Sequence, residues 1–390
     1  MANEQDQYLQ PQVARGLEGI TAAATEIAEV DGARGKLTLR GYDVSELSGR
    51  ITFEEVAYLL WHGHLPNSAQ LAELQAEISA ARELPAPVLE ALRVLSTHAS
   101  GMHILRMGVA MLSVGDANVD SLDIPENRKR AARLQTQIAS VVAHSYRLGQ
   151  GLEIVHPKPE HGLAAGFLYM LEGVEPEQAR IDGLNAYLVA VSEHGLNAST
   201  FAGRVTVATD SDMVSALTAA VSALKGPKHG GVPGPVLKML EAIGTPANAD
   251  QYIRNQMASG KRIMGFGHRI YKVRDPRAAL LGDAAEKMSA LTGDRSLLDL
   301  TQAVEETTVR VLGELKPGRD LYANVELYAA LILHAVGVPS ELFTPVFAIG
   351  RTAGWTAHII EQIEENRLIR PQSVYVGPRE LKWKPIEERE

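Results

Sequence analysis

Apolar residues recur at intervals of three and four along most of the chain. This spacing lines up one hydrophobic stripe on a helix, so each segment that shows it predicts an amphipathic helix. The clearest such segments are 53–60, 181–191, 214–224 and 304–315. No segment shows an equally strong strand-like alternation of apolar and polar residues. The pattern therefore predicts a nearly all-α fold.

Residues that start or stop helices mark the ends of these segments. Ser211 is a good N-cap for the helix over 214–224, and Gly226-Pro227 ends it. Pro317-Gly318 ends the helix over 304–315. The final helix is predicted to begin after Thr344 as N-cap, with Pro345 at its first position.

One short β-hairpin is predicted near the start of the chain. The segment 25–30 leads into Asp31-Gly32, a turn signal, and the segment 36–40 leads out with alternating apolar residues. The expected fold class is therefore all-α with a short N-terminal hairpin.

Composition and charge narrow the classes of partner. The chain has 390 residues, which is room for two domains, and a formal net charge of -9. That charge argues against nucleic acid and anionic membrane as partners, although a local arginine cluster still suits a small anion. The chain has no cysteine, which excludes disulfides and thiolate chemistry. No apolar run is long enough to span a bilayer and the first residues are polar, so we expect a cytoplasmic protein.

Three segments place titratable groups beside glycines or at a predicted helix start. They are 225–231, which contains His229, 265–277, which contains His268, and 324–328, which contains Glu326. Glycines beside a histidine allow the backbone to approach a ligand closely. These segments are the candidates for chemistry.

The segment 265–277 suits an anionic ligand. His268 follows a Gly-x-Gly turn, and Lys272 and Arg277 follow it along the chain. A histidine near two cations favours a polycarboxylate or a phosphate. A solvated basic helix face with one capping histidine explains the same residues equally well.

The sequence contains none of the common metal-binding, nucleotide-binding or hydrolase motifs. The chain has no His-Glu-x-x-His and no convincing histidine–carboxylate cluster, so no metal site is expected. It also has no phosphate loop, no dinucleotide fingerprint and no hydrolase elbow.

The segment 265–277 resembles the citrate synthase motif, Gly-aromatic-Gly-His followed by Asp-Pro-Arg at fixed spacing. Glycines, histidine, proline and arginine fall in register over more than a dozen residues, which makes the match specific. Other segments resemble the family in the same order, and the resemblance covers almost the whole chain. They are 16–20, 39–43, 193–201, 224–231, 341–347, 351–358 and 370–371.

The resemblance implies a helical homodimer with its active site between two domains. The large domain would comprise residues 1–230 and 338–390, and the smaller, mobile domain residues 231–337. Closure of such a cleft excludes water. The family needs no permanent cofactor or metal, and uses acyl-CoA as a co-substrate.

The resemblance also assigns roles to residues. Oxaloacetate binding falls on His194, His268, Arg277 and Arg351, and Arg370 matches an arginine that the family supplies from the partner subunit. CoA binding falls on Arg262, Gly265, Gly267 and Lys272.

The expected chemistry is the condensation of acetyl-CoA with oxaloacetate. By resemblance, Glu326 is the catalytic base, His229 stabilises the enol of acetyl-CoA, and His268 is the acid at the oxaloacetate carbonyl. Methyl protons of a thioester are weakly acidic, so a carboxylate must remove one while a donor stabilises the oxygen that gains charge.

Three departures from the family leave alternatives open. Most members have aspartate where this chain has Glu326, proline where it has Ala323, and Ala-Asn where it has Val232-Pro233. A 2-methylcitrate synthase that uses propionyl-CoA differs by one methyl group, which residue-by-residue reading does not resolve. A weakly active CoA- and oxaloacetate-binding paralogue is the third alternative, and in it Glu326 is a solvated glutamate at a helix N-terminus.

Overall fold

A computed structural model describes residues 13–47, 49–99, 101–230, 233–268, 270–316, 318 and 321–389. The chain divides into a large helical unit, Thr25–Arg367, and a small unit of the two terminal segments, Met1–Ala24 and Leu368–Glu390. Within the described ranges, no helix combines the length and the apolar character needed to cross a membrane.

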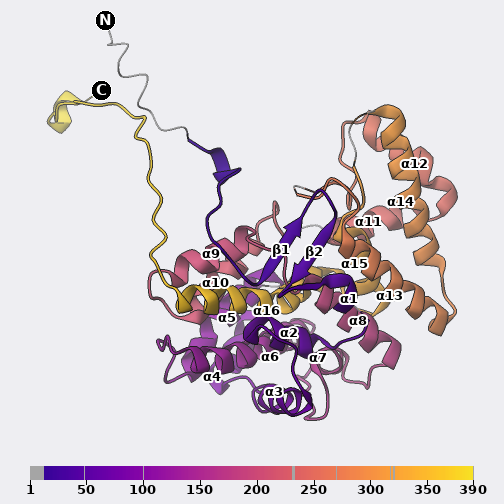
Figure 1. Cartoon of the computed structure of the whole chain (residues 1–390), viewed down its shortest axis with the longest axis horizontal. Helices are drawn as coiled ribbons and strands as arrows, with labels where there is room; N and C mark the ends of the chain where they lie inside the picture. Colours follow the sequence, from indigo (N-terminus) through magenta and orange to yellow (C-terminus); the bar gives the residue numbers. More distant parts are fainter. Residues whose placement is uncertain are drawn as a thin grey trace, which may run out of the picture. The chain divides into compact units, whose positions relative to one another are not determined.

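Helices dominate the large unit (Figure 1). In chain order they are α1 (Val44–Leu47), α2 (Phe53–His62), α3 (Ser68–Ala80), α4 (Ala86–Leu95), α5 (Met102–Met111), α6 (Ile124–Gly149), α7 (Leu163–Glu172), α8 (Gln178–Val191), α9 (Ala198–Val207), α10 (Met213–Leu224), α11 (Pro233–Ile243), α12 (Ala249–Ala258), α13 (Pro276–Thr292), α14 (Ser296–Leu315), α15 (Val325–Ala335) and α16 (Phe343–Glu364). The prediction of an all-α fold is confirmed.

The predicted hairpin is also confirmed. Strands β1 (Ala28–Asp31) and β2 (Lys36–Leu39) pair antiparallel, with Ala28 opposite Leu39, and β3 (Tyr42–Asp43) joins β2. The tip of the hairpin lies against a loop far along the chain, because Lys272 N donates to Gly32 O at 2.9 Å.

Helix α16 runs through the middle of the helical unit (Figure 1). It packs against α2, α6, α8, α9 and α10. Every residue from Ala348 to Ile360 is buried. Small residues allow the closest approach: a Cβ on Gly350 would lie 3.2 Å from Leu188 O, and Gly354 N donates to Ser192 O at 3.2 Å. The loop that follows α8 is therefore held directly against α16.

The predicted apolar stripes face the core except at Leu315, which is exposed at the end of α14. Two predicted caps are wrong. Asp212, and not Ser211, caps α10 and accepts from Ser215 N, because its carboxylate reaches the third residue of the helix. Helix α16 begins at Phe343 after a short 3₁₀ turn, so Thr344 lies inside it and donates to Gly230 O at 2.8 Å. Helix α14 ends at Leu315, as expected, and Pro317 lies outside the described residues.

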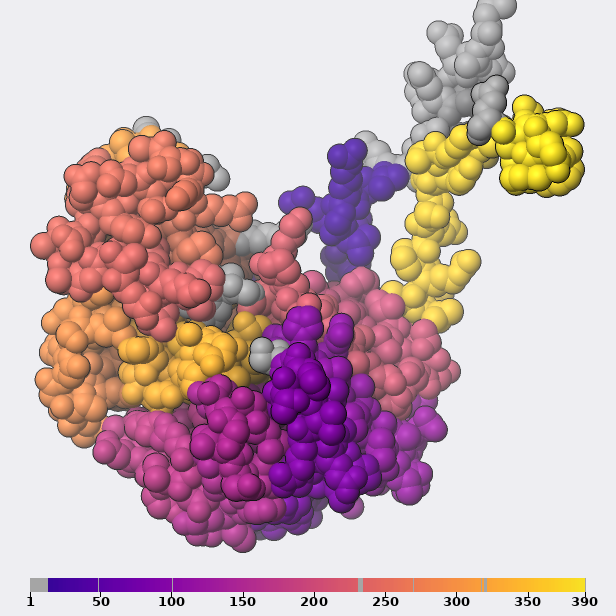
Figure 2. All heavy atoms as spheres, turned by 180° about the vertical axis from the view of Figure 1, so that it is seen from behind, coloured from indigo at the N-terminus to yellow at the C-terminus, as the bar shows by residue number. Residues whose placement is uncertain are grey.

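Helices α11, α12 and α14 form a lobe at one side of the helical unit (Figure 2). Helix α12 packs on α14 and α11 packs on α15, while α13 packs on α8. The expected division into residues 1–230 with 338–390 and residues 231–337 stays a prediction, and residues 231 and 232 lie outside the described part of the chain.

The terminal unit carries Arg370 and has exposed apolar side chains. These are Val13, Leu17, Ile20, Leu368, Tyr375, Val376, Leu381, Trp383 and Ile386.

The close approach at Gly354 predicts a stability difference between two glycines. In Gly354→Ala the new Cβ would lie 2.4 Å from Ser192 O, so the backbone must shift and the free energy of unfolding should fall by about 1–3 kcal/mol. Gly313 in α14 has nothing within 4 Å of an added Cβ, so Gly313→Ala should raise it by about 0.5–1 kcal/mol. Thermal unfolding of both variants checks this, and a Gly354→Ala protein as stable as the parent would contradict it.

Candidate active site

Two loops are joined by backbone hydrogen bonds at the start of α15. Gly267 N donates to Tyr322 O at 2.9 Å, and Asn324 N donates to Gly265 O at 2.9 Å. The Asn324 side chain adds a bond to Gly267 O at 2.9 Å. Gly265 and Gly267 have φ of 80° and 82°, which an L side chain rarely adopts. The loop that carries His268 is therefore fixed against the loop that leads to Glu326.

Asp275 fastens the same region to α13. It caps α13 by accepting from Arg277 N, and its two oxygens accept from Arg277 Nε at 3.0 Å and Nη2 at 2.7 Å. Val325 N also donates to it, at 3.3 Å. Arg277 is 3% exposed. A solvated basic face is therefore wrong for Arg277, whereas Lys272 does lie exposed.

His268 is held as a neutral donor. Its Nδ1 accepts from Ile270 N at 3.0 Å and from Tyr271 N at 3.1 Å, so in the neutral ring the hydrogen lies on Nε2. Burial, together with the charge of Arg277, lowers the pKa of His268 to about 4. The ring is thus uncharged at neutral pH and offers one N–H.

His194 stands beside His268 at the end of α8. The two ring centroids are 5.3 Å apart, and His194 Nε2 lies 3.2 Å from the Tyr271 hydroxyl. Burial lowers the pKa of His194 well below its usual value, and the charges of Arg277 and Arg351 lower it further. His194 is therefore a second neutral histidine among cations.

Arg351 projects from α16 into this group. Its Nε donates to Val191 O at 2.7 Å, and its guanidinium lies 4.7 Å from the Phe347 ring centroid. Burial lowers the pKa of Arg351 to about 10, the carboxylate of Glu193 opposes this, and Arg277 adds to it. Arg351 remains charged at neutral pH.

Glu193 is a buried counter-charge of Arg351. It is fully buried, and His358 Nε2 lies 3.2 Å from its Oε1. His358 Nδ1 accepts from Arg204 at 2.9 Å, so His358 Nε2 donates to Glu193. The carboxylate therefore has a charge-assisted partner.

His229 lies in the loop after the end of α10, where the charge of Arg351 acts on it. Its Nε2 is 2.8 Å from Ser199 Oγ, which also accepts from Trp355 Nε1 at 3.0 Å. Burial and the charge of Arg351 lower the pKa of His229 to about 4. The serine hydroxyl also lies 2.7 Å from Asn197 Oδ1. Its single proton can therefore be donated either to Asn197 or to His229, but not to both.

Glu326 occupies the first turn of α15, and its carboxylate does not face solvent. The residue as a whole is half-buried, but its Oε2 is closed off from solvent and has no hydrogen-bond partner among the described residues. Burial raises the pKa of Glu326 to about 7, against the opposing charge of Arg277. The solvated-glutamate alternative is therefore wrong.

The structure unites six of the expected site residues through α8, α13, α15, α16 and two loops. They are His194, His229, His268, Arg277, Glu326 and Arg351. The expected CoA residues Arg262 and Lys272 are exposed, and Arg370 belongs to the terminal unit.

Sequence reasoning missed three positioning partners inside segments that it had singled out. Ser199 contacts His229, Tyr271 contacts His194, and Glu193 compensates Arg351. Their proximity to the site residues depends on tertiary contacts, so the only available signal was their place beside the motif histidines.

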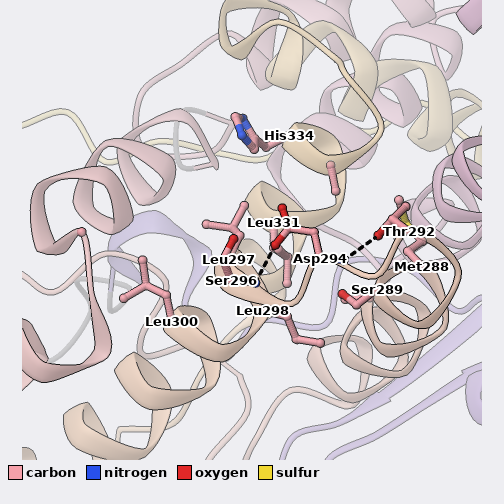
Figure 3. A pocket seen from close by; sticks show the side chains of 13 residues that line it. Met288, Ser289, Thr292, Asp294, Ser296, Leu297, Leu298, Leu300, Leu331 and His334 are labelled. Atoms are coloured by element: carbon pink, nitrogen blue, oxygen red, sulfur yellow. Dashed lines mark hydrogen bonds between the residues drawn. The ribbon is translucent and has the colours of Figure 1, made fainter.

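Cavity size does not locate this site. A cavity of about 520 Å³ lies between the end of α13, the start of α14 and the end of α15 (Figure 3). Its lining includes Asp294, which accepts from Ser296 N at 2.9 Å, and the apolar residues Leu298 and Leu331. It contains none of the six clustered residues. No group of three or more His, Asp or Glu suited to a metal ion occurs in the described part of the chain.

Comparison with known proteins gives one family. Residues 16–372 match the family described as "Citrate synthase, C-terminal domain". Citrate synthase 2 of Bacillus subtilis is 41% identical over 376 residues, which covers 96% of this chain and 99% of that one. The 2-methylcitrate synthase of Mycobacterium tuberculosis is 36% identical over 367 residues, covering 94% and 91%.

A solved structure has the same fold. It is citrate synthase from Thermoplasma acidophilum in a ternary complex with carboxymethyl coenzyme A and oxaloacetate. It matches with a TM-score of 0.89 and 32% identity over 97% of this chain and 100% of that one. Enzymes of this family transfer acyl groups. Family match, sequence identity and fold agree, and the chain belongs to the citrate synthase family.

Proposed function

We propose that this protein condenses acetyl-CoA with oxaloacetate and water to give citrate and CoA. The observation that carries the proposal is the meeting of two buried arginines, three neutral histidines and one buried carboxylate in a single cluster. The arginines suit a dicarboxylate, and the remaining groups suit acid–base chemistry on uncharged atoms.

The first step is removal of a methyl proton from acetyl-CoA. Glu326 takes the proton, and its pKa of about 7 leaves it a stronger base than an ordinary carboxylate while still largely ionised above neutral pH. His229 donates to the thioester oxygen that gains charge. This needs the hydrogen on Nδ1, which follows when Ser199 donates its proton to Nε2.

The second step is attack of the enol carbon on the ketone of oxaloacetate. His268 presents its Nε2–H to the ketone oxygen, because Nδ1 is already occupied by two backbone donors, and gives it the proton as the carbon–carbon bond forms. The ring regains a proton through solvent when Glu326 releases the one it took from the methyl group. Arg277, Arg351 and His194 bind the carboxylates and orient the carbonyl. Water then cleaves the thioester of the product and releases CoA.

The acyl-CoA is proposed to bind beside the lobe of α11, α12 and α14. Arg262 and Lys238 line a cavity of about 260 Å³ together with Tyr252 and Met264. Two cations beside an aromatic ring suit the phosphates and adenine of CoA. The Thermoplasma relative was solved with carboxymethyl coenzyme A and oxaloacetate, which supports this pair of ligands for the family fold.

A 2-methylcitrate synthase is the second candidate, favoured by the Mycobacterium tuberculosis relative of that name. The two donors differ by one methyl group, which a pocket discriminates by about 1–3 kcal/mol. We expect kcat/KM with oxaloacetate to be at least about tenfold higher for acetyl-CoA than for propionyl-CoA. The reverse order would replace the proposed substrate and retain the mechanism, and ligand binding without thiol release from either donor would favour the weakly active paralogue.

Removing the proposed base should strongly reduce turnover without weakening oxaloacetate binding. In Glu326→Gln we expect kcat to fall by about 10²-fold or more, while the Kd of oxaloacetate changes little because the arginines bind it. In the parent protein kcat/KM should decrease as the pH falls through about 7, where Glu326 gains its proton. Steady-state kinetics from pH 5 to 9, with calorimetric binding, measures both.

Glu326→Asp is the matched control for the length of the side chain. It keeps the charge but withdraws the carboxylate by roughly 1 Å, so kcat should drop if the loop at Ala323 has adapted to glutamate. A higher kcat would show that the site prefers aspartate. Intact turnover in Glu326→Gln would refute the assignment of the base.

Arg370 is proposed to complete the site of a partner subunit in a homodimer. Arg370→Ala and His268→Ala should each be inactive alone. Mixed dimers regain one site with both groups, so mixing the two variants should restore up to about a quarter of the parent activity when subunits pair at random. Activity is assayed after mass spectrometry has confirmed subunit exchange, and no recovery would argue against a shared site.

A further inference from the structure

Tyr187 lies on the helix that borders most of the candidate site. Helix α8 packs against α13, α15 and α16, which carry Arg277, Glu326 and Arg351. Tyr187 is fully buried, and the charges of these three residues act on its hydroxyl. Its hydroxyl therefore belongs to the same buried group as the proposed base.

The hydroxyl has no hydrogen-bond partner among the described residues. A buried hydroxyl without a partner costs about 1–3 kcal/mol, and such groups are rare in native proteins. Phenylalanine would fill the same space without this cost. Burial also raises the pKa of Tyr187 well above its usual value, so the group keeps its proton and remains a donor.

The carboxylate of Glu326 has an acceptor oxygen without a hydrogen-bond donor. Its Oε2 is closed off from solvent and has no partner among the described residues, although a carboxylate oxygen is a strong acceptor. Glutamate has three side-chain torsions, so small rotations move the carboxylate over several ångströms. Oε2 of Glu193 is also unpaired, but the carboxylate that acts on the Tyr187 hydroxyl is that of Glu326. An unpaired donor and an unpaired acceptor thus lie in the same buried group.

We propose that Tyr187 is a positioning residue for Glu326: its hydroxyl donates to the Glu326 carboxylate when substrates fill the site, and so fixes the base in its ionised, productive orientation. The inference rests on the proposed role of Glu326 as the base. It assigns to Tyr187 no contact with the reacting atoms. The bond it forms removes two unsatisfied groups in one step.

With oxaloacetate bound, the arginines near Glu326 leave this donor role to Tyr187. Arg277 donates through two nitrogens to Asp275 and Arg351 donates through Nε to Val191 O, and their other nitrogens are proposed to bind the carboxylates of oxaloacetate. From α14, Glu305 faces away and pairs with Arg274 and with the Tyr328 hydroxyl. On α11, Lys238 lines the separate cavity beside Arg262. The other titratable groups at the site are the neutral histidines His194, His229 and His268, Tyr271 beside His194, and Glu193, which acts on Arg351.

The test is Tyr187→Phe, which removes one oxygen atom. We expect kcat to fall by about tenfold, with the Kd of oxaloacetate unchanged. The acidic limb of the pH–kcat profile should move up by about one pH unit, because the ionised carboxylate loses a donor. The midpoint of thermal unfolding of the free protein should not decrease, since the hydroxyl has no bond to lose.

Tyr328→Phe is the matched control. Its hydroxyl is also largely buried and lies two residues from Glu326, but it donates to Glu305 at 2.6 Å. Here we expect a lower midpoint of thermal unfolding with the acidic limb unmoved. An unchanged kcat and acidic limb in Tyr187→Phe would overturn the proposal, and so would a stability loss like that of Tyr328→Phe without any kinetic change.

A double-mutant cycle separates this inference from the proposed function. If Tyr187 acts through Glu326, Tyr187→Phe should cause no further loss of kcat in a Glu326→Gln background. A full additional tenfold loss would overturn the positioning role while leaving Glu326 as the base. Intact turnover in Glu326→Gln alone would instead overturn the base assignment, and the positioning role with it.

Discussion

The burial of two guanidinium groups side by side is the constraint on which the rest of the site depends. Arg277 and Arg351 each disfavour the charged form of the histidines around them, and Arg277 also opposes the charge of Arg351. Each therefore needs its own buried carboxylate, Asp275 for Arg277 and Glu193 for Arg351. Arg277 keeps Nη1 and Arg351 keeps its two terminal nitrogens without a hydrogen-bond partner among the described residues, and these nitrogens are the ones proposed to bind the substrate.

Burial, reinforced by the arginine charges, explains why the neighbouring histidines are neutral. Burial lowers the pKa of His268 and of His194, and the charge of Arg277 lowers both further, so the two rings act as hydrogen-bonding groups and not as cations. The carboxylate of Glu326 is affected in the opposite sense: burial raises its pKa, and the arginines limit the rise. One electrostatic arrangement thus sets the protonation of acid and base together.

Local sequence predicted the fold class, the hairpin and the motif residues because these depend on short-range patterns. The stripe that begins at Phe53 is buried, and the glycines around Phe266 have the backbone angles that only glycine adopts readily. The predicted N-cap was wrong where two neighbouring residues can both cap a helix, because Asp212 and not Ser211 caps α10. The burial of the Glu326 carboxylate and the pairing of Glu193 with His358 needed tertiary contacts that no local pattern encodes.

The position of α16 has a consequence for folding kinetics. It is the last long helix of the chain, yet it supplies the centre of the core, and its Glu361 accepts from Glu26 N at 2.8 Å across 335 residues of sequence. Contacts of such high sequence separation form slowly. Helix α16 covers faces of α2, α6, α8, α9 and α10. During synthesis these faces stay exposed to solvent until nearly the whole chain has left the ribosome. A chain truncated before α16 would therefore lack both Arg351 and the central element of its core, and would be prone to aggregation.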